Sequence, residues 1–288
     1  MGPGFRRDDS GVGETVNNTS TLTNIPGTVV LAGAGKMGGA MLTGWLTRGL
    51  PPARIAVVEP TPSSEISALT AKGIRLNPQG TGVADTLVIA VKPQSFREAG
   101  PTLRSFTGPD TLVVSIMAGM TIASLQEVCG SAIVRAMPNT PAAIGRGITV
   151  AVPAGNVSAA QRATADALLS ATGAVEWVED EVLMDAVTAV SGSGPAYVFL
   201  LAEELARAGV AAGLPAELAA KLARETVTGS GELLHRSELS PATLRQNVTS
   251  PGGTTAAALA VLMSEDGLQQ LMRRAIAAAT ARSKELAK

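Results

Sequence analysis

Cysteine and histidine are almost absent from this chain. Cys129 is the only cysteine and His235 the only histidine among 288 residues. A lone cysteine cannot form an intramolecular disulfide, and one residue of each kind cannot supply the four ligands of a structural zinc site. We therefore expect no disulfide and no metal site, and a reducing cytoplasm is the compartment that fits.

The chain also lacks a charge bias and a long apolar run. Lys and Arg number 23 against 24 for Asp and Glu, so nothing points to nucleic acid or an anionic membrane as a partner. No stretch approaches about 18 uninterrupted apolar residues, the length of a membrane span, and residues 1–24 contain no signal-peptide core. We predict a soluble protein with a mobile N-terminal tail, residues 1–24, and a small-molecule ligand.

From residue 28 onward, short apolar runs alternate with stretches of helical length. Strands that are apolar throughout and alternate with helices indicate a parallel sheet covered on both faces, a doubly wound Rossmann-type α/β fold. Two later strands flank a helix that begins with the capping-box spacing of Ser158 and Gln161 and that we expect to end at Gly173. The predicted strands are 28–32, 54–59, 86–91, 111–117, 132–136, 147–152 and 175–178, and helices are predicted at 63–72, 94–105 and 121–128.

The strand signal disappears near residue 180. The remaining residues are dominated by Ala, Leu, Glu and Arg, with a helix stop at Gly213 and restarts at Pro215 and Pro241. Because residues 182–212 are apolar on nearly every face, they suit a helix buried against a second copy of the chain. We predict a dinucleotide-binding domain at 25–180 and an all-helical dimerisation and substrate domain at 181–288, in a homodimer or an assembly of dimers.

A glycine-rich turn follows the first predicted strand. Gly33, Gly35 and Gly38 give the spacing G-x-G-x-x-G between the end of a strand and the start of a helix. The first glycine permits a tight turn, the second lets the backbone approach a pyrophosphate, and the third allows close packing of helix on strand. The turn predicts a dinucleotide site that includes Gly33, Ala34, Gly35, Lys36, Met37 and Gly38.

The residue that ends the second predicted strand bears on the choice of cofactor. Glu59 is an acid at the position where a carboxylate binds the ribose hydroxyls and disfavours a 2′-phosphate. Thr61, Ser63 and Ser64 follow it and could hydrogen-bond a phosphate, although no arginine is near to neutralise one. The sequence favours NADH and leaves NADPH open.

Four further segments resemble a known family. AVKP (90–93), RAMPNTP (135–141), SGSGPAY (191–197) and SPGGTT (250–255) appear in the order and approximate spacing of pyrroline-5-carboxylate reductases. The resemblance extends from about residue 25 to the last helix. It implies hydride transfer from NADPH or NADH to the cyclic imine 1-pyrroline-5-carboxylate, which gives L-proline.

The resemblance also implies which residues line the nicotinamide side of the cofactor cleft. Without it, Lys92 would be interpreted as a solvated strand end and Asn139, between two prolines, as a turn residue. Both segments directly follow predicted strands, and cofactors lie at the carboxyl ends of parallel strands. The residues implied are Ala90, Val91, Lys92, Pro93, Met137 and Asn139.

The segment SPGGTT resembles the substrate loop of the family. Its glycines let the backbone approach a ligand, and consecutive amides at a helix start can hold a carboxylate. A helix start capped by Ser or Thr is the alternative interpretation of the same residues. The resemblance places Thr255 near the imine nitrogen as the catalytic residue, and it implies that Ser191, Ser250, Gly252, Gly253, Thr254 and Thr255 bind the substrate.

Three other functions share the glycine turn. A β-hydroxyacid dehydrogenase needs a proton donor for its carbonyl oxygen, usually a lysine at the position that Val198 holds here. A nucleotide-sensing protein without catalysis would have no use for SPGGTT, and a methyltransferase would bind S-adenosylmethionine. Reduction of a protonated imine removes a positive charge, so that reaction requires neither an oxyanion hole nor a metal.

Overall fold

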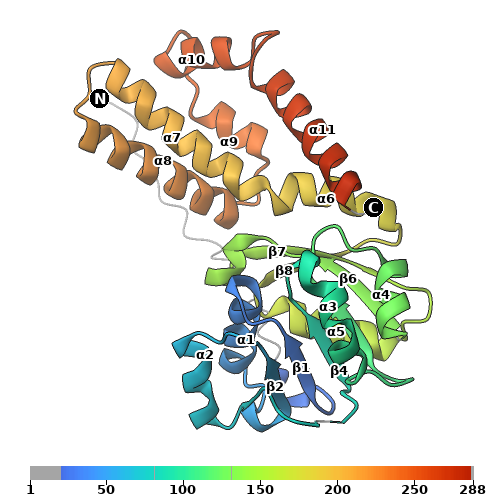
Figure 1. The fold of residues 1–288 in the computed structure, drawn as a ribbon. Helices are drawn as coiled ribbons and strands as arrows, with labels where there is room; N and C mark the ends of the chain where they lie inside the picture. Colours follow the sequence, from blue (N-terminus) through green and yellow to red (C-terminus); the bar gives the residue numbers. More distant parts are fainter. Residues whose placement is uncertain (1–20, 81, 131, 287–288) are drawn as a thin grey trace.

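The computed structural model describes residues 21–80, 82–130 and 132–286. A sheet with helices on both faces forms the N-terminal part, and a helical region follows it (Figure 1). Most of the predicted tail, 1–24, lies outside the described residues. Its last residues are packed, because the 3-10 helix η1 (Leu22–Asn24) buries Leu22, 1% exposed, and the Leu22 N–H donates to the Arg48 carbonyl at 2.8 Å. The packed structure thus begins a few residues earlier than predicted.

Eight strands form the sheet in the order β3-β2-β1-β4-β5-β6-β7-β8. All neighbours are parallel except β6 and β7, which are antiparallel. The first six positions have the order of a dinucleotide-binding doubly wound sheet, with the switch point between β1 and β4, so the predicted fold class is confirmed. The strands are β1 (Val29–Ala32), β2 (Ile55–Val58), β3 (Arg75–Leu76), β4 (Thr86–Ile89), β5 (Leu112–Ser115), β6 (Ala132–Met137), β7 (Gly147–Pro153) and β8 (Gly173–Trp177).

Successive residues of the strands are buried in different hydrophobic clusters on the two faces of the sheet. On one face, Val29 and Leu31 pack with α1 (Lys36–Thr47), α2 (Ser64–Ala68) and α5 (Ala159–Ser170). On the other face, Val30 and Ala32 pack with α3 (Phe96–Arg104) and α4 (Ile122–Cys129). Short 3-10 helices join these elements: η2 (Pro52–Arg54), η3 (Leu69–Lys72), η4 (Pro93–Ser95) and η5 (Thr140–Ile144).

Two local predictions differ from the structure. The stretch 63–72 divides into α2 and η3 and leads to β3, a two-residue strand that no apolar run announces. The helix with the capping box forms as expected, with the Gln161 N–H donating to Ser158 Oγ at 3.2 Å. It ends at Ser170, however, and Gly173, whose φ is 143°, begins β8.

The helical region leaves the sheet at residue 181 and returns to it at its end. Helices α7 and α8 pack along each other, and α11 runs back to α6, where Ser283 Oγ donates to Asp185 Oδ1 at 2.7 Å (Figure 1). The elements are η6 (Glu181–Leu183), α6 (Met184–Val187), the π-helical turn η7 (Thr188–Gly192), α7 (Gly194–Ala211), α8 (Ala216–Arg236), α9 (Pro241–Asn247), α10 (Thr254–Leu262) and α11 (Leu268–Leu286).

An ion pair fastens the start of this region to the sheet. Arg135 Nη1 on β6 lies 2.8 Å from Glu181 Oε1, which also accepts the Ile122 N–H of α4 at 2.8 Å. The Arg135 side chain is only 6% exposed. Glu181 therefore neutralises a buried cation and completes the first turn of α4 at the same time.

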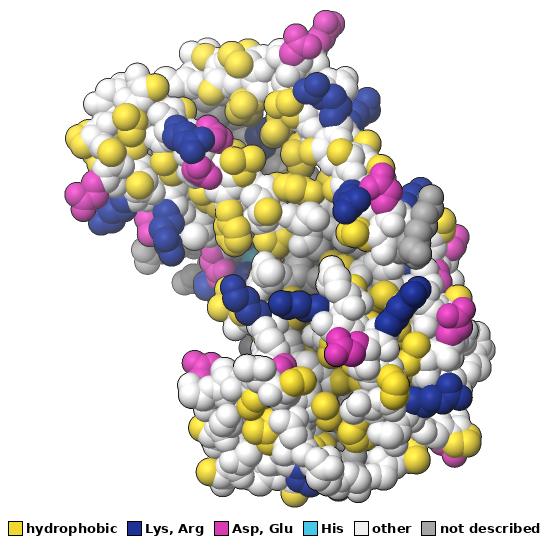
Figure 2. Space-filling view, in the orientation of Figure 1, with side chains coloured by type: hydrophobic (Ala, Val, Ile, Leu, Met, Phe, Trp, Pro, Cys, Tyr) yellow, Lys and Arg dark blue, Asp and Glu magenta, His cyan; other side chains and the backbone are white. Residues whose placement is uncertain are grey.

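Apolar side chains cover much of the helical region's surface in Figure 2. Phe199 of α7 is 68% exposed, and Leu205 and Leu222 are also exposed. Phe199 and Leu205 belong to residues 182–212, the stretch that we expected to be buried against a second copy. None of the helices in the described part of the chain combines the length and apolar character that crossing a bilayer requires.

Candidate active site

Two of the three motif glycines are required by the fold itself. Gly33 has a φ of 90°, and a Cβ there would lie 2.7 Å from the Ala90 carbonyl carbon. A Cβ on Gly38 would overlap the Gly33 carbonyl oxygen. Gly35 differs, because its φ of −67° suits any residue and a Cβ there would have no neighbour within 4 Å. The open side of Gly35, at the N-terminus of α1, therefore fits a pyrophosphate that approaches the backbone.

A cavity of about 560 Å³ lies beside this turn, at the carboxyl ends of β1, β2 and β4. The structure thus brings together, around one space, residues that the sequence assigned to the cofactor from three separate segments. Those lining it are Gly33, Gly35, Glu59, Ala90, Val91 and Lys92. A dinucleotide is expected at this edge of such a sheet.

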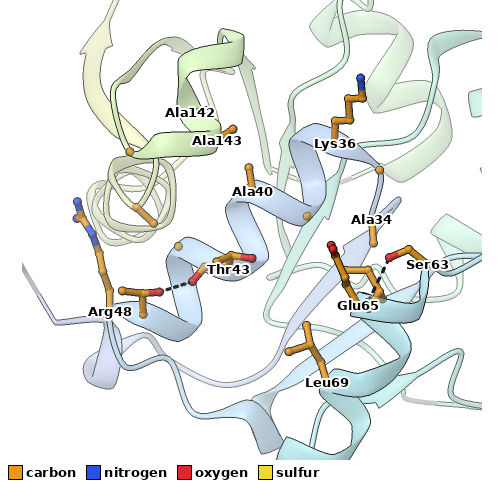
Figure 3. A pocket seen from close by; sticks show the side chains of 17 residues that line it. Ala34, Lys36, Ala40, Thr43, Arg48, Ser63, Glu65, Leu69, Ala142 and Ala143 are labelled. Carbon is orange, nitrogen blue, oxygen red and sulfur yellow. Dashed lines mark hydrogen bonds between the residues drawn. The ribbon is translucent and has the colours of Figure 1, made fainter.

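The other predicted residues of the turn lie elsewhere. Ala34 and Lys36 line a second cavity, of about 680 Å³, between α1, α2 and η5 (Figure 3). Met37 packs against the core, so its side chain contributes to the fold. Small residues of α1 and η5 face each other across this second cavity, where Figure 3 shows Ala40 opposite Ala142.

Glu59 is fixed at the edge of the first cavity by four hydrogen bonds. Its Oε2 accepts the Ala34 N–H at 2.8 Å and its Oε1 accepts the Thr61 N–H at 3.2 Å. Asn77 holds the backbone of Glu59, accepting its N–H at 2.8 Å and donating to its carbonyl at 2.9 Å. Sequence reasoning missed Asn77, although an Asn before Pro78 is a typical signal of a turn.

Of the segments predicted on the nicotinamide side, the one around Met137 meets the helical region. Lys92 and Pro93 stand at the start of η4, and Asn139 Oδ1 accepts the Ile148 N–H at 2.9 Å, the turn role that its flanking prolines suggest. Met137 lies against Gly192 so closely that a Cβ there would overlap its Cε. This contact brings the segments MPN and SGSG together.

Ser191 lies in the π-helical turn η7, beside that contact. Its Oγ is buried and has no hydrogen-bond partner within the described part of the chain. Tyr197 spans the turn, donating its hydroxyl to the Ala189 carbonyl at 3.0 Å. Pro195 lies in the first turn of α7, where proline is tolerated. A π-turn with an unsatisfied hydroxyl is typical of functional positions.

The segment SPGGTT forms a turn and the start of α10. Gly252 has a φ of 70°, and Gly253 is the N-cap, with no side chain among the described residues bonded to the first amides of the helix. The interpretation as a helix start capped by Ser or Thr is therefore wrong. Figure 1 shows α10 at the far end of the helical region from α1. A single chain thus does not bring Ser250, Thr254 and Thr255 to the cofactor cavity.

A Rossmann sheet with this glycine turn, followed by a helical region, defines a dinucleotide-binding protein. A family model described as pyrroline-5-carboxylate reductase dimerisation matches residues 181–286, and one described as NADP oxidoreductase, coenzyme F420-dependent, matches residues 28–119. The pyrroline-5-carboxylate reductase of Pseudomonas aeruginosa is 39% identical over 264 residues, which cover 90% of this chain and 96% of that protein. The chain belongs to the pyrroline-5-carboxylate reductase family.

Solved structures agree with this assignment. A pyrroline-5-carboxylate reductase from Coxiella burnetii superposes with a TM-score of 0.82 at 35% identity, over 91% of this chain and 99% of its own. The Plasmodium falciparum pyrroline carboxylate reductase with NADP bound gives 0.75 at 29% identity, over 92% and 99%. The predicted oxidoreductase is confirmed, and the dehydrogenase, nucleotide-sensing and methyltransferase alternatives are set aside.

Proposed function

We propose that this chain reduces 1-pyrroline-5-carboxylate to L-proline, the last step of proline biosynthesis, with the cofactor held in the cavity beside the glycine turn. The observation that carries the proposal is this cavity, which gathers residues of three predicted cofactor segments at the switch point of a Rossmann sheet. When bound, the reduced nicotinamide supplies a hydride to the imine carbon.

The residues of the turn and of the neighbouring strand ends have separate tasks. The open side of Gly35 and the first amides of α1 receive the pyrophosphate. Lys92, Pro93 and the amide nitrogen of Asn139 border the nicotinamide. Their task is to orient the ring against the imine, since hydride transfer depends on close alignment of the reacting atoms.

The uncapped N-terminus of α10 binds the substrate carboxylate. Consecutive N–H groups at a helix start carry a partial positive charge and need acceptors, and no side chain caps this one. The positive φ of Gly252 shapes the turn that exposes these amides. Ser250 and Thr254 supply hydroxyl donors beside them, and Thr255 stands near the imine nitrogen. Ser191 lines the opposite side of the substrate.

A second copy of the chain completes the site. In one chain α10 lies far from the glycine turn (Figure 1). The cofactor and the substrate therefore meet only if the loop at residues 250–255 comes from a partner. The exposed apolar faces of α7 and α8 lie within the region matched by the dimerisation model. A homodimer, or an assembly of dimers, buries these faces. The cytoplasmic location stays a prediction.

The direct test is oxidation of the reduced cofactor in the presence of 1-pyrroline-5-carboxylate, followed by absorbance with NADH and NADPH in parallel. We expect imine-dependent oxidation and formation of proline. A purified, folded protein that oxidises neither coenzyme in the presence of the imine would refute the proposed activity.

Mixing two impaired variants, at a cofactor concentration too low to saturate Gly35→Ala, tests the shared site. Gly35→Ala impairs the cofactor side and Thr255→Ala the substrate side, so a mixed dimer has one site with both defects and one with neither. If subunits exchange freely, about a quarter of the wild-type activity returns, because half of the dimers are mixed and each has one intact site. If each site were built within one chain, mixing would restore nothing.

A further inference from the structure

We propose that the chain selects NADH over NADPH by means of Glu59, which Asn77 holds in place. The inference rests on the proposed function, whose cofactor it names. It differs from what the Plasmodium falciparum relative, with NADP bound, would suggest.

The Glu59 carboxylate lies where it can bind the hydroxyls of the adenosine ribose. Glu59 directly follows β2, the strand that pairs with β1, and it lines the cofactor cavity. Each of its oxygens accepts one backbone N–H, from Ala34 at 2.8 Å and from Thr61 at 3.2 Å. A carboxylate has about four acceptor positions. The remaining positions can accept the two ribose hydroxyls, whereas a 2′-phosphate brings oxygens that have no proton to donate.

Asn77 holds the backbone from which the Glu59 side chain extends. Its side-chain amide bonds both the N–H and the carbonyl of Glu59, at 2.8 and 2.9 Å. Asn77 has a φ of 44°, and it is the one non-glycine residue with a positive φ in the described part of the chain. Asparagine is among the few side chains that tolerate this conformation. Asn77 is therefore a positioning residue, which acts on the cofactor through Glu59.

Nothing along the cavity offsets the negative charge of Glu59 at the ribose. Of the charged residues that line it, two are acids, Glu59 and Glu98, and the single cation, Lys92, stands at the end of β4 on the nicotinamide side. Arg75, two residues before Asn77, does not line the cavity. A 2′-phosphate would meet a carboxylate with no guanidinium to bind it, and like charges in contact are strongly unfavourable.

Thr61 and Ser63, two of the residues that the sequence left open as phosphate ligands, already take part in local hydrogen bonds. The Thr61 N–H donates to Glu59, and Ser63 Oγ accepts the Ile66 N–H at 3.2 Å as the N-cap of α2. Figure 3 shows Ser63 turned toward this helix start. The preference for NADH therefore rests on the charge of Glu59 in a cavity whose lining includes no arginine.

The test compares AMP with adenosine 2′,5′-bisphosphate, which differ only by the 2′-phosphate, in calorimetric titrations of the full-length protein. We expect AMP to bind at least about 10-fold more tightly, and NADH to exceed NADPH by a similar factor. Glu59→Gln, which keeps the shape and removes the charge, should bring the ratio close to one. Equal or tighter binding of the bisphosphate by the wild type, or an unchanged ratio in Glu59→Gln, would overturn the proposal.

Asn77→Gly separates positioning from folding, because glycine adopts a positive φ readily and removes only the side-chain bonds. We expect the AMP preference to fall several-fold, whereas a purely structural role would weaken both ligands equally and would refute the role of Asn77. Glu127→Gln on the exposed surface of α4 makes the same charge change and should leave the ratio unaltered. A protein that prefers NADPH yet reduces the imine would refute only this inference, and one that prefers NADH yet leaves the imine unreduced would refute only the proposed activity.

Discussion

Gly35 and Gly38 stand three residues apart in the same turn, yet alanine should affect them in opposite ways. At Gly38 a methyl group would overlap the Gly33 carbonyl oxygen and press on the Ala90 side chain, 3.2 Å away. Overpacking of this kind costs about 1–3 kcal/mol of folding free energy. At Gly35 the backbone is ordinary and the space is open, so alanine should cost within about 1 kcal/mol, the usual effect at an N-cap.

Cofactor binding, in contrast to folding stability, should be strongly weakened by alanine at Gly35. The methyl group in Gly35→Ala stands where the pyrophosphate must approach the first amides of α1, and each weakened hydrogen bond to a charged group costs about 1.5–3 kcal/mol. We expect the dissociation constant for NADH to rise about 10- to 100-fold in Gly35→Ala, with little loss of stability.

Urea denaturation at fixed protein concentration and calorimetric titration with NADH measure the two effects on the same samples. Gly38→Ala is the matched control, because it adds the same methyl group to the same turn and should lower the unfolding free energy. The reasoning fails if Gly35→Ala binds NADH as the wild type does, or if it loses as much stability as Gly38→Ala.

Three further predictions concern residues outside the turn. Burial raises the pKa of the Cys129 thiol to about 11, from 9.0, despite the opposing charge of Arg104, so the unfolded chain loses this proton first as pH rises. Stability should fall by up to about 2 kcal/mol between pH 9 and 11 in the wild type and not in Cys129→Ala, as measured by denaturation across that range. Glu181→Ala leaves the buried Arg135 without its partner and should cost about 3 kcal/mol in urea denaturation, and Glu181→Gln clearly less. Ser191→Ala removes an unsatisfied buried hydroxyl, so thermal stability should hold or rise while KM for the imine increases; an unchanged KM would count against substrate contact.

The sequence predicts those parts of the fold that local chemistry decides. The strands of the sheet core are apolar on both faces, and Gly33 and Gly38 meet backbone that excludes a Cβ, so both features leave a visible pattern. Strand β3 left none, because its two residues are only half-buried and form no apolar run. The π-turn around Ser191 depends on a shift of hydrogen-bond register that small residues allow but do not specify.

The site was predictable in its parts but not in its assembly. Glu59 follows from its place after the second strand, whereas the bond from Asn77 depends on the path of a loop that returns to β2. The motif SPGGTT predicts a helix start suited to an anion, but its distance from the glycine turn is decided by how the helices of residues 181–286 pack. Tertiary packing of this kind is not encoded in any short segment.

The bond between Ser283 and Asp185 joins the last helix to the first helix of the same region. The region is therefore closed at its base, and its two ends cannot drift apart independently. The loop at residues 250–255 lies at the opposite end of the region (Figure 1). A rotation of the region by a few degrees about α6 would therefore displace this loop more than the residues near the base.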